Sequence, residues 1–349
     1  MLRGAIVGLG NVALDGHLPG WSAREGVEIV AVTDVQRDRR AEATARMPQA
    51  RWFDTAEALL EHAELDFVDI CTPPSSHAPL IEGALARGRH VLCEKPLVRS
   101  PAELDRVGRL AAAHARVLHT VHNWHHAPIV QRAAALVRDG AIGAMRRVTW
   151  QTLRVQPAAT RDPNGVNWRL DPAVAGGGIL TDHGWHVFYI VQRWVGARPL
   201  ALSAQLERRR HTTLSVEDTA RVRLTFPDAT AEILLTWAAD ERRNWARLDG
   251  ADGSLELRDD TLVLSRGAAA ERQWPCPPAL SNGSVHPDWF APVAGEFVAE
   301  ATGGGGDGAN LAEASLCVLL ESLARESSRR DGETLPVPPA GVLAQAERA

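Results

Sequence analysis

The sequence predicts an α/β protein with two domains: an N-terminal doubly wound parallel sheet, and a C-terminal α+β domain with a large open, mainly antiparallel sheet. In residues 1–121, short apolar runs alternate with segments of helical periodicity, as in parallel sheets with helical crossovers. From residue 122, strand-like runs follow one another with turn signals between them. The 349 residues also exceed the usual size of one domain. We therefore expect domains at 1–121 and 122–349.

The N-terminal domain is expected to contain short buried strands separated by helices. Segments 78–87 and 101–114 carry apolar residues at helical spacing. Right-handed crossovers of this length make the strands parallel and bring their carboxyl ends to the edge where ligands bind. The predicted strands are 5–8, 29–33, 67–72, 90–93 and 117–121.

The C-terminal domain is expected to form one large sheet followed by a last helix at 311–327. Turn signals such as Pro227-Asp228 and the segment 250–253 separate its strands. An open sheet of this kind has helices on one face, which leaves the other for solvent or a second subunit. We therefore expect a homodimer or homotetramer formed through this sheet. The predicted strands are 146–155, 200–207, 220–226, 230–237 and 262–265.

Composition excludes several classes of protein. The net charge of −5 and pI near 6.2 give no attraction to nucleic acids. No apolar run reaches the ~20 residues of a membrane span, and the N-terminus lacks the pattern of a signal peptide. The four cysteines show no CxxC spacing, so neither a disulfide framework nor a cysteine-based zinc site is expected. We expect a cytoplasmic protein with no membrane or nucleic-acid partner.

A GxGxxA motif follows the first predicted strand and precedes a helix. Gly8 and Gly10 allow a tight turn and close approach to a pyrophosphate, whose charge meets the free N–H groups of the helix N-terminus. The expected cofactor contacts in this turn are Gly8, Gly10, Asn11 and Val12. This motif makes residues 1–121 a candidate dinucleotide-binding domain of the Rossmann type.

Two further segments extend this cofactor site. Asp34 ends the second predicted strand, where a carboxylate binds the adenosine ribose hydroxyls and favours NAD over NADP. Arg37, Arg39 and Arg40 leave NADP open, because they offer charges for a 2′-phosphate. The Pro-rich turn after the third predicted strand lies at the ligand-binding edge. Its residues Thr72, Pro73 and His77 are candidate contacts on the nicotinamide side.

The combined motifs resemble those of the Gfo/Idh/MocA oxidoreductases along nearly the whole chain. These motifs are the GxGxxA turn, the strand-terminal Glu94-Lys95-Pro96, a GxIG stretch at 140–143, Trp168-Arg169, and a GGG-x3-D-x3-H segment at 176–186. The resemblance implies that Glu94 and Lys95 contact the cofactor, and that Lys95 acts on the substrate hydroxyl. It also suggests a cis Lys95–Pro96 bond. Residues 122–349 would then be the substrate-binding and oligomerisation domain.

The candidate catalytic residues are Lys95, Asp182 and His186. An ammonium stabilises a developing alkoxide, and a histidine titrates near working pH, so Lys95 would polarise and His186 would act as the base. Asp182 and His186 are four apart on a predicted helix and share one face, while His183 points elsewhere. Asp182 either binds a neighbouring hydroxyl or orients His186.

The segment after the last strand of the N-terminal domain is rich in histidine and aromatic residues. We interpret it as part of a substrate pocket rather than a metal site, with Asn123, His126 and Trp168 as candidate contacts; Trp124 and Trp185 are further aromatic candidates. Tyr189 departs from the family pattern, which often has an acidic residue there.

The function expected from these residues is NAD(P)-dependent hydride transfer between nicotinamide and a secondary alcohol or ketone of a sugar, cyclitol or related polyol. Two alternatives remain. One is a glycosidase that retains NAD for transient oxidation, and the other is a non-catalytic dinucleotide-binding sensor. The intact Lys95, Asp182 and His186 argue against the sensor.

Overall fold

The computed structural model describes all residues except 63, 161–165, 268–270, 284, 304–307 and 341–349. The chain divides into two compact units, which we describe separately. Unit 1 comprises residues 1–123, 159–168 and 284–318, and unit 2 comprises residues 124–158, 169–283 and 319–349. Each unit is therefore assembled from segments that are distant in the sequence.

Unit 1 contains a six-stranded sheet in the order β3-β2-β1-β4-β5-β6, with every neighbouring pair parallel. This is the strand order of a Rossmann fold, whose switch point lies between β1 and β4. The predicted parallel sheet is confirmed, although the short strand β3 was not predicted. The strands are β1 (Leu2–Val7), β2 (Val27–Thr33), β3 (Arg51–Phe53), β4 (Phe67–Ile70), β5 (His90–Cys93) and β6 (Leu118–Thr120).

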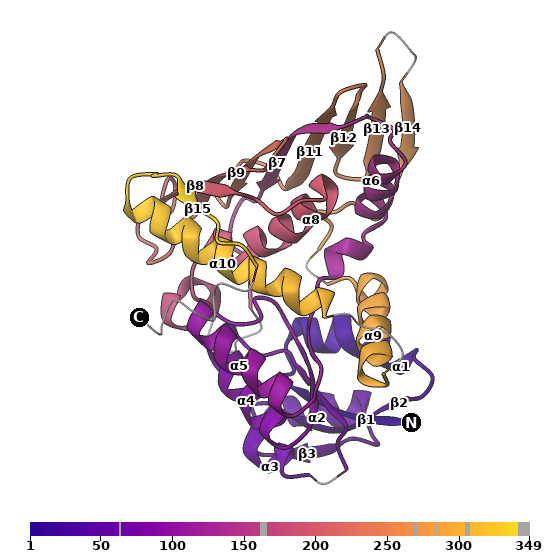
Figure 1. Ribbon diagram of the computed structural model, residues 1–349. Coiled ribbons are helices and arrows are strands. Elements are labelled where there is room, and N and C mark those ends of the chain that lie inside the picture. Colours follow the sequence, from indigo (N-terminus) through magenta and orange to yellow (C-terminus); the bar gives the residue numbers. More distant parts are fainter. Residues whose placement is uncertain (63, 161–165, 268–270, 284, 304–307, 341–349) are drawn as a thin grey trace. The chain divides into compact units, whose positions relative to one another are not determined.

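Helices cover both faces of this sheet, with α4 and α5 to one side and α1 with α9 to the other (Figure 1). Local signals fix several helix starts: Ser100 accepts the N–H of Glu103 at the start of α5, directly before Pro101. The helices are η1 (Val12–His17, a π-helical turn), α1 (Leu18–Ser22), α2 (Arg39–Arg46), α3 (Ala56–Leu60), η2 (Pro74–Ser76), α4 (His77–Ala86), α5 (Pro101–Ala113) and α9 (Pro287–Ala301).

The late helix α9 belongs to the core of unit 1. Phe290 and Phe297 on α9 are buried in one cluster with Trp21 and Phe67. A segment near the end of the chain therefore completes the N-terminal sheet domain.

Unit 2 contains a nine-stranded sheet in the order β14-β13-β12-β11-β7-β10-β9-β8-β15. Among the described strands of this nine-stranded sheet, only β7 and β10 pair in parallel. The predicted mainly antiparallel sheet is therefore confirmed. The strands are β7 (Met145–Leu153), β8 (Ala201–Glu207), β9 (Thr219–Thr225), β10 (Thr230–Thr236), β11 (Arg243–Gly250), β12 (Ser254–Arg258), β13 (Thr261–Ser265), β14 (Arg272–Pro275) and β15 (Leu335–Pro336).

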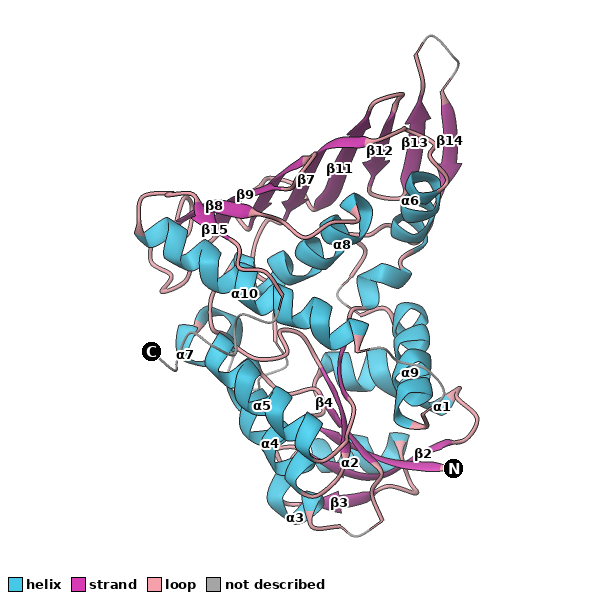
Figure 2. Ribbon diagram, in the orientation of Figure 1, coloured by secondary structure: helices cyan, strands magenta, loops and turns pink. Residues whose placement is uncertain are grey.

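Helices α6 and α8 lie on the same side of this sheet (Figure 2). Ala231, Ile233 and Leu235 on β10 are buried, whereas Arg221 and Arg223 on β9 are exposed, as expected of a sheet with one covered face. The remaining helices are η3 (Asn123–His126), α6 (Pro128–Arg138), η4 (Trp168–Leu170), α7 (Pro172–Ala175), η5 (Leu180–Gly184, a π-helical turn), α8 (Trp185–Val195) and α10 (Ala309–Arg329, shared between the units). Within the described part of the chain, no helix combines the length and apolarity needed to cross a membrane.

Candidate active site

The dinucleotide turn lies directly after β1, and its two glycines have different tasks. Two observations show that position 8 requires glycine. Gly8 has a φ of 88°, which other residues rarely adopt, and a Cβ there would lie only 2.8 Å from Cγ2 of Thr72. A Cβ at Gly10 would meet only the guanidinium of Arg39, at 3.8 Å. The backbone at Gly10 is therefore accessible to a ligand.

Asp34 ties the end of β2 to this turn. Its carboxylate accepts the backbone N–H of Leu9 at 2.6 Å and a hydrogen bond from Arg39 at 2.9 Å. The backbone N–H of Gln36 adds a third bond, at 2.8 Å. Asp34 and Arg39, which favour NAD and NADP respectively, are thus paired with each other beside the glycines.

The turn also contains a buried polar atom whose hydrogen-bonding capacity is not satisfied by any described residue. Oδ1 of Asn11 is buried and has no hydrogen-bond partner among the described residues. Such an atom costs free energy unless a partner arrives. The open backbone at Gly10 and the unsatisfied Asn11 fit a bound dinucleotide, whose pyrophosphate would meet the N-terminus of η1.

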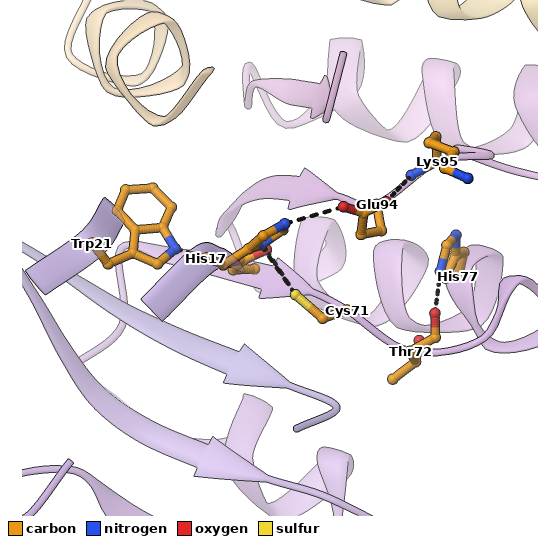
Figure 3. A network of polar contacts seen from close by, with 8 residues as sticks. His17, Trp21, Cys71, Thr72, His77, Glu94 and Lys95 are labelled. Atoms are coloured by element: carbon orange, nitrogen blue, oxygen red, sulfur yellow. Dashed lines mark hydrogen bonds and ion pairs between the residues drawn. The ribbon is translucent and has the colours of Figure 1, made fainter. Parts of the chain in front are cut away.

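The predicted nicotinamide edge is formed by the loops after β4 and β5 (Figure 3). Thr72 and Pro73 are half-buried, and the Thr72 hydroxyl accepts a hydrogen bond from Ser76 at 2.7 Å. His77 is fully buried, with Nε2 2.8 Å from the carbonyl of Thr72 and Nδ1 2.8 Å from the carbonyl of Pro96. Burial lowers the pKa of His77 despite these carbonyls. Its ring joins the two loops.

Lys95 follows β5 at the same edge and is the only lysine in the sequence, whereas the chain uses arginine for every other strongly basic side chain. Its backbone N–H donates to Oε2 of Glu94 at 3.0 Å, and the Lys95–Pro96 peptide bond is cis, as predicted. A compact ammonium differs from a guanidinium in hydration and in its ability to exchange a proton. A lone lysine in an arginine-rich chain indicates that position 95 requires that chemistry.

In unit 2, the glycine triplet packs against the β9 region. A Cβ at Gly178 would lie 1.9 Å from the carbonyl oxygen of Glu217, so only glycine fits. The Glu217 carboxylate accepts the N–H groups of Gly178 at 2.9 Å and Leu180 at 3.3 Å, and its other partner is Arg325. These contacts hold the start of the η5–α8 helix that carries Asp182 and His186.

Asp182 lies on the π-helical turn η5, with an exposed fraction of 15% for its side chain. His183 Nδ1 is 3.1 Å from its carboxylate, and Arg169 Nε is 3.8 Å away. The prediction that His183 points elsewhere is wrong, because a π-helical turn does not follow the 3.6-residue period on which it was based. Asp182 is instead surrounded by basic side chains, including the charge of the buried Arg154.

His186 is buried near the start of α8, held by aromatic neighbours. Trp124 stacks on its ring at 4.4 Å between centroids with an interplanar angle of 7°. Nδ1 of His186 is 2.8 Å from the Tyr189 hydroxyl, which also accepts the backbone N–H of Trp124 at 3.1 Å. Tyr189 and Trp124 therefore fix the plane and rotation of the His186 ring.

The candidate substrate contacts differ in accessibility. Asn123, His126 and Trp168 are half-buried, on η3 and η4. Trp185 is buried in the core and Trp124 is covered by His186, so neither is freely exposed. Two nearby histidines contact carboxylates in unit 1: Nδ1 of His119, on β6, is 2.9 Å from Glu300, and Nδ1 of His122 is 2.7 Å from Glu313.

Sequence reasoning missed two residues that hold these groups in place, His17 and Glu217. His17 lies four residues after Ala13, on the helix that follows the dinucleotide turn, and contacts Glu94. The sequence carried no signal for His17, because η1 is a π-helical turn without the 3.6-residue period and the partners of His17 are distant in the chain. Glu217 gave no signal either, since its partners are also distant in sequence.

Two family models match this chain. The oxidoreductase model with an NAD-binding Rossmann fold matches residues 2–122, and the GFO/IDH/MocA C-terminal domain model matches residues 130–256. The chain belongs to the Gfo/Idh/MocA family. As a Gfo/Idh/MocA protein it is an NAD(P)-dependent oxidoreductase, and unit 1 contains its NAD-binding fold.

Similar proteins of this Gfo/Idh/MocA family include two curated enzymes. D-apiose dehydrogenase of Paraburkholderia graminis is 29% identical over 297 residues, which is 81% of this chain and 75% of the relative. The dTDP-3,4-didehydro-2,6-dideoxy-alpha-D-glucose 3-reductase of Streptomyces antibioticus is 30% identical over 260 residues, 73% of this chain and 75% of that enzyme. A solved structure of levoglucosan dehydrogenase with NADH and levoglucosan has a TM-score of 0.83 at 21% identity, covering 97% of this chain and 100% of that one. This last likeness supports the fold.

Proposed function

We propose that this Gfo/Idh/MocA oxidoreductase transfers a hydride between NAD and a secondary alcohol or ketone of a sugar, cyclitol or related polyol. The observation that carries the proposal is Lys95, the one lysine of the chain, at the ligand-binding edge of the Rossmann sheet. The curated relatives support the substrate class, because they are named as enzymes of apiose and of a dTDP-linked sugar.

Each candidate residue has a role in this reaction. When bound, NAD supplies the acceptor for the hydride that leaves the substrate carbon. The ammonium of Lys95 stabilises the alkoxide as it develops, and His186 accepts the hydroxyl proton at Nε2, since Nδ1 faces Tyr189. Asp182, amid basic side chains, binds a neighbouring substrate hydroxyl.

We assign cofactor contacts to Gly8, Gly10, Asn11, Val12 and Asp34 for the adenosine and pyrophosphate part. For the nicotinamide side we assign Thr72, Pro73, Glu94 and Lys95, with His77 acting through the loops that it joins. Asn123, His126 and Trp168 are proposed to contact the substrate. Residues 122–349, apart from the segments 159–168 and 284–318 that belong to unit 1, are proposed to form the substrate-binding and oligomerisation domain.

We also propose a cytoplasmic homo-oligomer formed through the open sheet of unit 2. Free thiols at all four cysteines support a reducing compartment. The exposed Arg221 and Arg223 belong to the uncovered sheet face and provide charge for a partner copy.

The test is absorbance at the reduced-nicotinamide band with NAD or NADP and a panel containing D-apiose, D-xylose, levoglucosan, inositols and their keto forms. Substrate-dependent reduction of NAD is the expected result. If the protein binds NAD but reduces it with no substrate of the panel, the dehydrogenase proposal fails. Release of a sugar from a glycoside by protein with firmly retained NAD would then establish the transient-oxidation glycosidase.

A further inference from the structure

His17 lies at the centre of a buried polar cluster in unit 1 (Figure 3). It ends η1, the helix after the dinucleotide turn, and is 1% exposed. Phe290 stacks on its ring at 3.8 Å between centroids with an interplanar angle of 13°. This packing holds the imidazole plane in one orientation, so its two nitrogens point in fixed directions.

Both ring nitrogens face carboxylates. Nδ1 is 2.9 Å from Oδ2 of Asp69, and Nε2 is 3.1 Å from Oε1 of Glu94. A carboxylate accepts hydrogen bonds, so both contacts are made only when both nitrogens carry protons, that is, by an imidazolium. The Trp21 indole N–H donates to Asp69 at 2.7 Å, which further satisfies the Asp69 carboxylate.

The electrostatics agree with this geometry. Burial by itself lowers the pKa of His17, but the Asp69 charge and hydrogen bond outweigh it and hold that pKa well above its ordinary value. Burial by itself raises the pKa of Glu94, but the His17 hydrogen bond and the charges of His17 and Lys95 lower it overall. At neutral pH the pair is therefore a buried ion pair.

The His17–Glu94 pair is connected to Lys95, the proposed catalytic residue, through the Lys95 backbone N–H. Oε1 of Glu94 is held by His17, and Oε2 accepts the backbone N–H of Lys95. From the other side, His77 contacts the carbonyl of Pro96. The turn that presents Lys95 is thus held at two points, one of which depends on His17.

We propose that His17 is a positioning residue for Lys95: its ring fixes the Glu94 carboxylate, which fixes the Lys95 backbone and hence the direction of the ammonium. The inference rests on the proposed role of Lys95 in hydride transfer. Positioning matters because a displacement of about 1 Å in an active site costs about 100-fold in rate.

A metal ion is the competing occupant of this cluster, because His17, Asp69 and Cys71 bring ligand atoms within 4.8 Å of one another. A cysteine ligates as the thiolate. Here the Cys71 thiol lies 3.4 Å from Oδ1 of Asp69 as a donor, and its sulfur lies 3.2 Å from Nδ1 of His17. The cluster is satisfied as an ion pair of side chains.

The experiment compares Asp69→Asn with Asp69→Asn/His17→Gln. Both variants lack the Asp69 charge, so they differ in the ring that holds Glu94. The double variant leaves one carboxylate without the imidazole, whereas His17→Gln alone would leave two. The expected result is a kcat about tenfold or more lower in the double variant, with the Kd for NAD within about threefold. NAD binding is measured by fluorescence titration, and turnover with the best substrate of the sugar panel, both at temperatures well below each Tm.

A second readout needs no substrate. Because Lys95 is the only lysine, biosynthetic labelling with [ε-13C]lysine gives one side-chain resonance. That resonance is expected to move between the two variants. Superimposable resonances together with equal kcat values overturn the positioning role, as does stoichiometric zinc that is present in the wild type and lost with His17→Gln.

The variant Lys95→Ala distinguishes the proposed catalytic role of Lys95 from the proposed positioning role of His17. If Lys95→Ala keeps wild-type turnover, the dehydrogenase function stands, but the proposed role of Lys95 falls and this inference falls with it. If the wild type turns over no substrate of the panel, the proposed function itself fails. If Lys95→Ala is inactive while the two Asp69→Asn variants turn over equally, the proposed function stands and the role of His17 alone is refuted.

Discussion

The hydroxyl of Tyr189 lies 2.8 Å from Nδ1 of His186 and accepts the backbone N–H of Trp124. The residue that departs from the family pattern is thus the one that orients the proposed base. An acidic side chain in this place would add a negative charge beside the ring, whereas a phenol supplies a hydrogen bond without that charge. In this chain a phenol therefore orients His186.

Tyr189→Phe keeps the volume of this buried side chain and removes its hydroxyl. We expect a loss of about tenfold in kcat, because His186 gains rotational freedom and Trp124 loses an acceptor; the accompanying loss of stability is about 1 kcal/mol. Steady-state kinetics and urea unfolding measure the two effects. Unchanged kcat in a folded Tyr189→Phe protein would contradict the orienting role.

Lys95→Arg tests whether a positive charge is sufficient at position 95. The guanidinium is larger and does not exchange its proton at working pH, so turnover should fall by about 100-fold or more. Binding of NAD should be retained, as it should in Lys95→Ala and His186→Ala. Arg87→Lys, on an exposed ion pair with Glu61, is the matched control and should be neutral.

Asp34→Ala should change cofactor preference. Loss of the carboxylate removes a ribose acceptor and releases Arg39 from its bond to Asp34. The freed guanidinium can pair with a 2′-phosphate, so the kcat/KM ratio of NAD to NADP should fall about tenfold. Glu42→Ala, which breaks an exposed pair with Arg46, should leave that ratio unchanged.

The contacts of His17 with Asp69 and Glu94 predict how stability depends on pH. The raised pKa of His17 contributes stability that is present below its ordinary value of 6.5 and is lost as pH rises through the raised pKa. The lowered pKa of Glu94 contributes stability that is present above its ordinary value of 4.5 and is lost as pH falls through the lowered pKa.

His17→Gln should therefore cost about 3 kcal/mol of unfolding free energy near pH 7, and the cost should shrink as pH rises into the alkaline range. Urea unfolding of both proteins from pH 5 to 10 measures this. A difference that stays constant over that whole range would refute the ion pair.

Gly178→Ala should prevent the glycine triplet from packing on Glu217. The new Cβ would lie 1.9 Å from a backbone oxygen, which cannot swing away, so a loss of about 3 kcal/mol or more is expected. Gly108→Ala in α5 is the control, since a Cβ there meets no atom within 4 Å. That change should be neutral or stabilising by up to about 1 kcal/mol. Urea unfolding distinguishes them.

Local patterns predicted most of the strands and the order of motifs along them. The apolar run before Gly8 and the Pro-rich turn after β4 are short-range signals, and both lie at the expected edge of the parallel sheet. Strand β3 was missed because its three residues include the exposed Arg51 and carry no readable alternation.

The features that the sequence did not predict depend on contacts between residues that are distant in the chain. His17 is 52 residues from Asp69 and 77 from Glu94 in the chain, so its two partners became visible only in the folded unit. The π-helical turn at η5 likewise changed which side chains face Asp182, and no composition signal marks such a turn.

Helix α9 has a consequence for the synthesis of this protein. Its Phe290 and Phe297 fill the core around Trp21 and Phe67, so the first 123 residues leave the ribosome with that apolar surface uncovered. The sheet domain cannot reach its final stability until residue 297 has emerged. Translation therefore passes through a long interval in which this apolar surface is exposed, and a fragment ending after β6 is expected to aggregate.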